Sequence, residues 1–310
     1  MINILKSTDK GLVKVDKFDK DVWIHVTNPP LFELERLAME LDIPSDFLMD
    51  SLDIDERARI EVERKFTLVL IRIPRFDKSN ADVPFTTLPL GIIYTKDFIL
   101  TICLEKTDAI LDVSNSGVRD FIGENRGLFI LHVVRKTALL YLKYLKEINK
   151  KTDTLERELH KSMRNEELIK LLNIEKSLVL FTTSLKSNEI MMERLQKMDI
   201  LRGNPEYIDL LEDIIIDNRQ AIEMANIYSN ILSGMMDAFA SLIQNNMNIV
   251  IKFLTAVTII LTVPTIIVGA YGMNVRLPFQ NSQHAFFIIF CISLGLTILS
   301  TILFIKRRWF

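Results

Sequence analysis

The feature that most constrains this chain of 310 residues is an uncharged apolar run at residues 285–305. At 1.5 Å per residue, a helix of this length crosses a hydrocarbon layer of about 30 Å. A second apolar run, at residues 249–271, carries one charge, Lys252, near the end where an ammonium group can reach the membrane interface. Residues 272–284 between the two runs are rich in turn formers and polar groups. We therefore predict two antiparallel membrane helices that form a hairpin.

Basic residues predict the orientation of this hairpin. Lys306, Arg307 and Arg308 follow the second run, whereas the connecting loop contains only Arg276. The positive-inside rule then places the C-terminus in the cytoplasm, and an even number of spans places the N-terminal part there too. The N-terminus has no long apolar core, so we expect no cleavable signal peptide. The prediction is a multi-pass protein of the cell (inner or plasma) membrane with both termini cytoplasmic.

The distribution of charge excludes several classes of function. From residue 248 onward there are five basic and no acidic residues, which leaves 33 basic and 40 acidic residues upstream, a net charge of −7. An acidic domain of this kind argues against a nucleic-acid partner. Two distant cysteines argue against a disulfide framework, and the four histidines lack metal-ligand spacing. The chain also lacks phosphate-loop, dinucleotide-binding, zinc-protease and nucleophile-elbow motifs, so we expect neither an enzyme nor an organic cofactor.

The first 110 residues predict a mixed α/β domain. Short β-rich runs at residues 22–26, 66–73, 88–94 and 98–103 indicate a sheet. Asn28 followed by two prolines is typical of a capped helix start, and apolar spacing supports a helix up to Leu41. From about residue 128 to 200, helical periodicity with dense charge predicts two long helices in a hairpin.

A single helix is predicted from about residue 206 to 271. No glycine or proline occurs there before Gly234 and Pro264, and the roughly 66 residues would measure on the order of 100 Å. Such a helix would join the N-terminal domain directly to the first membrane span, so movement of the domain could lever the span. The alternative is a break near Gly234, because glycine costs about 1 kcal/mol in a helix interior.

The predicted organisation has seven parts. They are an α/β cytoplasmic domain (1–127), a long helical hairpin (128–203), a stalk helix (204–248), a first transmembrane helix (249–271), an extracytoplasmic loop (272–284), a second transmembrane helix (285–305) and a basic tail (306–310).

One side of the first span is lined by small polar residues. When successive residues advance by 100°, a stripe about 100° wide contains Asn248, Ile251, Thr255, Thr258, Thr262, Thr265 and Gly269, and Asp237 extends it toward the cytoplasm. One interpretation is helix-to-helix packing, with the hydroxyls bonded back to the preceding turn. The other is the lining of a water-filled path, which needs several copies of the chain because two helices cannot enclose a pore. Uncharged oxygen ligands suit a cation that keeps its water shell, and magnesium loses that shell most reluctantly.

The sequence Tyr271-Gly272-Met273-Asn274 ends the first span and precedes a short loop, a last span and a basic tail. Together with the large acidic N-terminal domain, this resembles the CorA family of magnesium and divalent-cation transporters over the whole chain. The resemblance implies a homopentamer with a funnel-shaped cytoplasmic domain and a pore lined by the first span. It also implies that Gly272, Met273 and Asn274 form an outer selectivity filter that receives hydrated magnesium.

Further roles follow from the resemblance when positions are carried over by ungapped spacing from Asn274. Asn248 falls on the inner pore asparagine and Asp237 on an acidic residue at the cytoplasmic pore mouth. Ile251 and Leu254 fall near the hydrophobic gate.

A regulatory site is implied in the same way. Asp213 matches the stalk carboxylate that binds inhibitory cytoplasmic magnesium together with an aspartate of the neighbouring protomer. Its partner would be Asp50, because residues 48–57 resemble the family's segment around that aspartate. The alternative for both residues is an ordinary solvated carboxylate.

Three departures from the family pattern bear on these roles. The loop after Asn274 has Arg276 and no glutamate, Met49 replaces a second regulatory carboxylate, and Thr262 replaces a pore methionine.

From the polar stripe and the family resemblance we expect passive entry of magnesium, with cobalt and nickel as further candidates, gated by cytoplasmic magnesium. The alternatives are a zinc transporter of the same superfamily and a non-conducting, membrane-anchored sensor or assembly protein. The expected partners are other copies of the chain, the lipid bilayer and divalent cations.

Overall fold

The computed structural model describes residues 1–8, 11–15, 17–18, 20–77, 83–110, 125–162, 165–275, 277–279 and 283–307. The predictions that involve Arg276 and Arg308 lie outside these residues. The chain divides into two compact units, Met1–Gly234 and Met235–Phe310.

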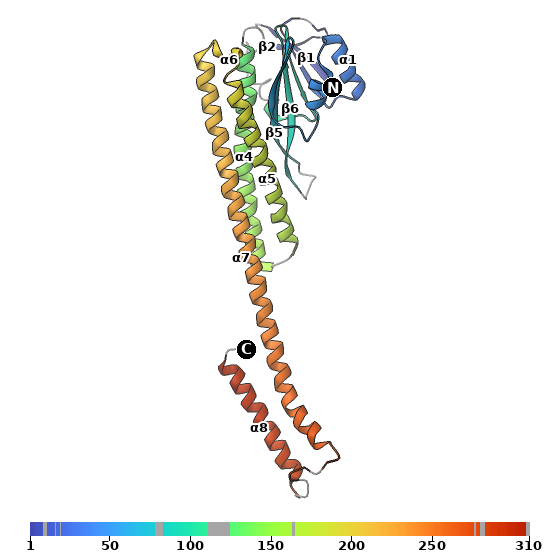
Figure 1. The fold of residues 1–310 in the computed structure, drawn as a ribbon, viewed down its shortest axis with the longest axis vertical. Coiled ribbons are helices and arrows are strands. Elements are labelled where there is room, and N and C mark those ends of the chain that lie inside the picture. Colours follow the sequence, from blue (N-terminus) through green and yellow to red (C-terminus); the bar gives the residue numbers. More distant parts are fainter. Residues whose placement is uncertain are drawn as a thin grey trace. The chain divides into compact units, whose positions relative to one another are not determined.

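The first unit is built on a seven-stranded sheet within the described residues (Figure 1). Its strands are β1 (Ile2–Thr8), β2 (Gly11–Val15), β3 (Val22–Thr27), β4 (Arg59–Glu63), β5 (Phe66–Phe76), β6 (Phe85–Tyr94) and β7 (Phe98–Cys103). Their order across the sheet is β2-β1-β3-β7-β6-β5-β4. The pair β3 and β7 is parallel and every other neighbouring pair is antiparallel.

Helices cover both faces of this sheet. Helices α1 (Leu31–Leu41) and α2 (Ser45–Asp50) pack on one face around Leu37 and Phe47. Helices α4 (Arg126–Ser162) and α5 (Asn165–Leu195), with α6 (Asp199–Arg202) and the start of α7 (Pro205–Tyr271), pack on the other. Burial on two faces explains why β5 is a nearly continuous apolar run instead of an alternating one.

The four predicted strand runs are confirmed as β3, β5, β6 and β7, and the helix after residue 30 is confirmed as α1. The predicted cap is wrong, because the N-cap of α1 is Pro30 and no side chain caps this helix. Asn28 instead has a left-handed φ of 45°, and its N–H donates to the carbonyl of Cys103. A short polar side chain tolerates this conformation at the end of β3.

Helix α7 is continuous from Pro205 to Tyr271, so the predicted long helix is confirmed and Gly234 does not break it. Pro264 lies inside the helix. Helices α7 and α8 (Ala285–Lys306) are long and apolar enough to cross a membrane.

A half-buried histidine gives the first unit a defined pH dependence. Trp23 donates its indole N–H to Thr101 Oγ1, which lies 2.9 Å from His25 Nδ1, and Thr27 Oγ1 lies 3.1 Å from His25 Nε2. Because the Thr101 hydroxyl accepts from Trp23, its own proton can go to Nδ1, which favours a neutral imidazole. Burial, aided by the N-terminal ammonium, lowers the pKa of His25 to about 4.

We therefore expect acid to destabilise this unit through His25. The folded pKa lies below the unfolded value of about 6.5, so the stabilising contribution is complete above pH 6.5 and is lost as the pH falls toward 4. Between pH 7 and pH 4.5 this should cost about 2 to 3 kcal/mol of unfolding free energy. Urea titration of the wild type and His25→Gln at both pH values measures this decrease in unfolding free energy. The variant should lack the part of the decrease that comes from His25. Equal decreases in the two proteins would contradict the prediction.

Candidate functional site

In the second unit, one face of α7 packs against α8. Residues of α7 that lose exposure recur every three or four positions, namely Ala256, Ile260, Val263, Ile267 and Ala270. On α8 the matching residues are Ile289, Ser293, Thr297 and Ser300, of which Ser293 is buried. Each helix therefore turns one stripe of small and apolar side chains toward the other.

The predicted polar stripe lies on a different face of α7. At 100° per residue, its centre is roughly 130° away from the centre of the face that packs on α8. All of its members are exposed in the single chain: Asn248, Ile251, Thr255, Thr258, Thr262, Thr265 and Gly269. A Cβ atom added to Gly269 would meet nothing within 4 Å. Packing inside the hairpin therefore does not account for the stripe.

Three threonine hydroxyls of the stripe bond to the preceding turn. Thr258 donates to the carbonyl of Leu254 at 2.8 Å, Thr262 to that of Thr258 at 2.7 Å, and Thr265 to that of Leu261 at 2.8 Å. A hydroxyl has one proton and two lone pairs. Since the proton is engaged by the helix, each of these threonines presents acceptor lone pairs to the exposed stripe.

The cytoplasmic end of the stripe carries exposed polar side chains. Asp237 is exposed, and its carbonyl accepts a hydrogen bond of 2.9 Å from the Ser241 hydroxyl. Asn248 is exposed, with Gln244 Nε2 at 3.5 Å from its Oδ1, and the apolar side chains of Ile251 and Leu254 follow it in the exposed part of the helix.

The loop after α7 starts with a tight helix end. The Gly272 N–H donates to the carbonyl of Val268 at 3.0 Å, and the Met273 N–H donates to that of Ala270 at 3.2 Å. Met273 and Asn274 are exposed just beyond this turn. The Tyr271 hydroxyl donates to the carbonyl of Pro278 at 3.2 Å and so ties both sides of the described part of the loop together.

Asp50 and Asp213 lie on opposite sides of the sheet in one chain. Asp50 ends α2 on one face, where the absence of a side chain on Gly91 lets Ser51 lie against β6. Asp213 is exposed on α7, and its neighbour Ile214 packs in the core of the other face. Carboxylate oxygens are ligands that magnesium prefers, so both residues fit such an ion chemically. Because the sheet separates them, one ion can bridge them only between two chains.

Asp50 is already paired within its own chain. Its Oδ2 accepts a hydrogen bond of 2.6 Å from Arg59 Nη2, while Arg59 also donates to Glu56 and, at 3.3 Å through Nε, to Glu61. Burial raises the pKa of Asp50, and the positive charge of Arg59 opposes the rise. The sequence prediction missed Arg59, because nothing in the order of residues 50–61 shows which carboxylates the guanidinium would reach.

A second missed residue, Arg72, fixes the segment that follows Asp50. Its guanidinium donates to the carbonyls of Ile54 at 2.5 Å and Glu56 at 3.0 Å, and to Thr87 Oγ1 at 2.8 Å. Its backbone N–H and carbonyl both bond to the Asn188 side chain of α5, at 2.9 and 2.8 Å. The available signal was a single charge inside the apolar strand at residues 66–73, since a buried charge needs partners.

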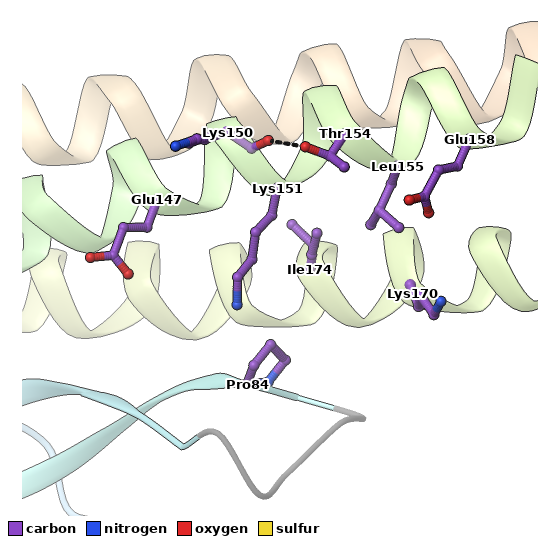
Figure 2. Close-up of a pocket in the computed structure, with 9 residues that line it drawn as sticks. All are labelled: Pro84, Glu147, Lys150, Lys151, Thr154, Leu155, Glu158, Lys170 and Ile174. Carbon is purple, nitrogen blue, oxygen red and sulfur yellow. Dashed lines mark hydrogen bonds between the residues drawn. The ribbon is translucent and has the colours of Figure 1, made fainter.

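A cavity of about 440 Å³ lies apart from these residues, between α4 and α5 near the start of β6 (Figure 2). It is lined by Pro84, Glu147, Lys150, Lys151, Thr154, Leu155, Glu158, Lys170 and Ile174. The Lys151 ammonium lies 4.4 and 4.7 Å from the ring centres of Phe76 and Phe85, so it makes cation–π contacts with both rings. None of the predicted site residues lines this cavity. Within the described part of the chain, no group of three or more His, Cys, Asp or Glu side chains could hold a metal ion.

Comparison with known proteins places these features in a family. The family model described as CorA-like Mg2+ transporter protein matches residues 19–307. A cobalt/magnesium transport protein CorA of Methanocaldococcus jannaschii is 28% identical over 321 residues, which covers 100% of both chains.

Solved structures agree with this match. The complete structure of the CorA magnesium transporter from M. jannaschii superposes with a TM-score of 0.86 at 26% identity, covering 100% of this chain and 99% of that one. The full-length CmaX protein superposes with a TM-score of 0.73 at 14% identity, covering 99% and 97% of the two chains, a likeness of fold alone. Since the family model spans nearly the whole chain, the protein described here belongs to the CorA-like Mg2+ transporter family.

Proposed function

We propose that this protein is a passive channel through which hydrated magnesium crosses the cell membrane into the cytoplasm, with α7 of several copies lining the path. One observation carries the proposal: the polar stripe of α7 lies on a face that α8 leaves free. A stripe directed away from the hairpin can meet its equivalents around an axis. We propose five copies, as the family resemblance implies, with Gly272, Met273 and Asn274 at the outer entrance.

The hydrogen-bonding groups of the stripe favour a cation over an anion as the ion that passes along it. Water molecules bound to a cation direct their hydrogens outward, so a hydrated cation donates hydrogen bonds to its surroundings. Thr258, Thr262 and Thr265 offer acceptor oxygens because their protons are bonded to the helix. An anion, whose hydration shell needs donors, would find few partners there. Magnesium suits this path best because it keeps its shell, and the name of the M. jannaschii relative adds cobalt as a second candidate.

The membrane potential supplies the driving force in this proposal. A divalent cation gains about 4.6 kcal/mol per 100 mV on moving to the negative side, twice the value for a single charge. No nucleotide site is then required, and we propose a transporter that is not an enzyme. Both termini lie in the cytoplasm in this arrangement, as the basic tail indicates.

We further propose that Ile251 and Leu254 form the gate and that Asp50 and Asp213 of neighbouring copies bind a regulatory magnesium ion. Two facing carboxylates repel each other when empty and are held together by a divalent cation between them. Bound cytoplasmic magnesium would then stabilise the closed state, and its loss would let the copies separate. The opposite placement of the two residues on the sheet supports a site between chains.

Uptake by proteoliposomes tests the proposal. The protein is reconstituted into vesicles that contain a magnesium-sensitive dye, an inside-negative potential is imposed, and magnesium, cobalt and zinc compete for entry. We expect magnesium influx that cobalt reduces and that zinc affects little. Preferred zinc entry would identify a zinc transporter, and the absence of any flux would identify a membrane-anchored sensor or assembly protein.

The stripe makes a specific prediction for matched threonines. Thr262 lies on the stripe, whereas Thr297 lies on the packed face of α8 and makes the same bond to the preceding turn, at 2.8 Å from Ser293. Replacement by valine removes one hydroxyl and one such bond in each case. We expect Thr262→Val to lower magnesium influx at least about fivefold, roughly 1 kcal/mol, and Thr297→Val to lower it less than about twofold. Equal effects in the dye assay would mean that the stripe does not line the path.

A further inference from the structure

We propose that Arg59 is a built-in competitor for the regulatory cation, because its guanidinium and the cation are like charges drawn to the same Asp50 carboxylate. Arg59 would thereby set the magnesium concentration at which the protein responds. The inference rests on the proposed role of Asp50 as a magnesium ligand and adds a residue that tunes this site.

The contacts of Arg59 carry the argument. All three of its guanidinium nitrogens are engaged: Nη2 with Asp50, Nη1 with Glu56 and Nε with Glu61. One positive charge thus faces three negative charges, which leaves a local excess of two negative charges. This uncompensated negative charge attracts a further cation toward Asp50.

The two positive charges oppose each other at the Asp50 carboxylate. The guanidinium already uses Asp50 Oδ2 at 2.6 Å, and a magnesium ion at the same carboxylate would lie close to a like charge. Arg59 can move away because its side chain is long and 30% exposed. When it does, Glu56 and Glu61 remain as partners near the surface.

The surrounding backbone stays in place during such an exchange. Arg72, which is 8% exposed, binds the carbonyls of Ile54 and Glu56, and Ser51 donates its hydroxyl to the Phe47 carbonyl at 2.6 Å. The exchange therefore needs only a rotation of the Arg59 side chain.

Protection against proteolysis measures cation binding without relying on transport. Full-length protein in detergent is digested with chymotrypsin, which does not cleave at arginine, over a series of magnesium concentrations at constant ionic strength. The midpoint of protection is compared for the wild type, Arg59→Met, Arg59→Gln and Asp50→Asn. Arg75→Met is the matched control, because Arg75 is 31% exposed and also pairs with carboxylates, those of Asp77 and Glu105.

We expect the midpoint to fall about tenfold in Arg59→Met and Arg59→Gln, the size of effect that loss of one charged hydrogen bond gives. Arg75→Met should stay within about twofold of the wild type, and Asp50→Asn should lose protection. If Arg59→Met fails to fold, as judged by size-exclusion chromatography, Arg59→Gln carries the comparison.

Two results separate the failure of this inference from that of the proposed function. If Asp50→Asn loses protection while both Arg59 variants keep or raise the wild-type midpoint, Arg59 does not compete and the proposed site survives. If Asp50→Asn is protected like the wild type, Asp50 is not a ligand and the regulatory site itself is wrongly assigned.

Discussion

Replacing Asn274 with alanine should lower magnesium influx about 100-fold and remove the preference for magnesium over cobalt. In the proposed pentamer each substitution removes five amide groups from the outer entrance. If each contributes about 0.5 kcal/mol to holding the hydrated ion, the lower end for a hydrogen bond, the loss is about 2.5 kcal/mol, which is on the order of 100-fold. Asn274 is exposed after the end of α7, so its removal should cost little stability. Dye-loaded proteoliposomes under an inside-negative potential provide the measurement.

The control for this prediction is Asn230→Ala, which removes an exposed amide from α7 in the first unit. Its influx should match the wild type. Asn274→Gln keeps the amide but moves it by one methylene, and we expect an intermediate loss. The selectivity-filter assignment fails if Asn274→Ala conducts at the wild-type rate with unchanged ion preference.

Replacing Arg72 with methionine should lower the unfolding free energy of the first unit by about 3 to 5 kcal/mol. The guanidinium is buried and holds the carbonyls of Ile54, Glu56 and Thr87. Each buried acceptor left without a donor costs about 1 to 3 kcal/mol, and partial relaxation reduces the sum. Urea titration followed by circular dichroism measures the change.

Arg75→Met in the same strand is the control, because its surface ion pairs should contribute at most about 1 kcal/mol. Since Arg72 fixes the segment after Asp50, we also expect Arg72→Met to weaken magnesium protection under conditions where the variant is still folded. A loss of less than 1 kcal/mol for Arg72→Met would show that water replaces the guanidinium and that the segment is not held by it.

The fold was predictable where local pattern decides it. Strands β3, β5, β6 and β7 are buried, and their apolar β-branched residues mark them in the sequence. Strands β1, β2 and β4 were missed because they alternate with charged residues at or near the sheet edges, as in Arg59–Glu63. Their position depends on pairing with distant strands, which local sequence does not show.

The candidate site was predictable to a different extent in the two units. The helical period of 3.6 residues was enough to group the polar side chains of α7, although only the packing of α8 shows which face stays free. The positions of Asp50 and Asp213 came from family resemblance. Arg59 and Arg72 were not found, because their partners are defined by strand pairing and by contacts as distant in sequence as Asn188.

Because α7 is continuous, the position at which it bends most easily matters for how movement passes along it. Gly234 is the last residue of the first compact unit, and a Cβ atom added to it would meet nothing within 4 Å. Packing therefore does not require glycine there, while a serine-glycine pair such as Ser233 and Gly234 is where helices bend most easily. Any tilt of the stalk during opening should concentrate at this pair, leaving the helical turns on either side intact.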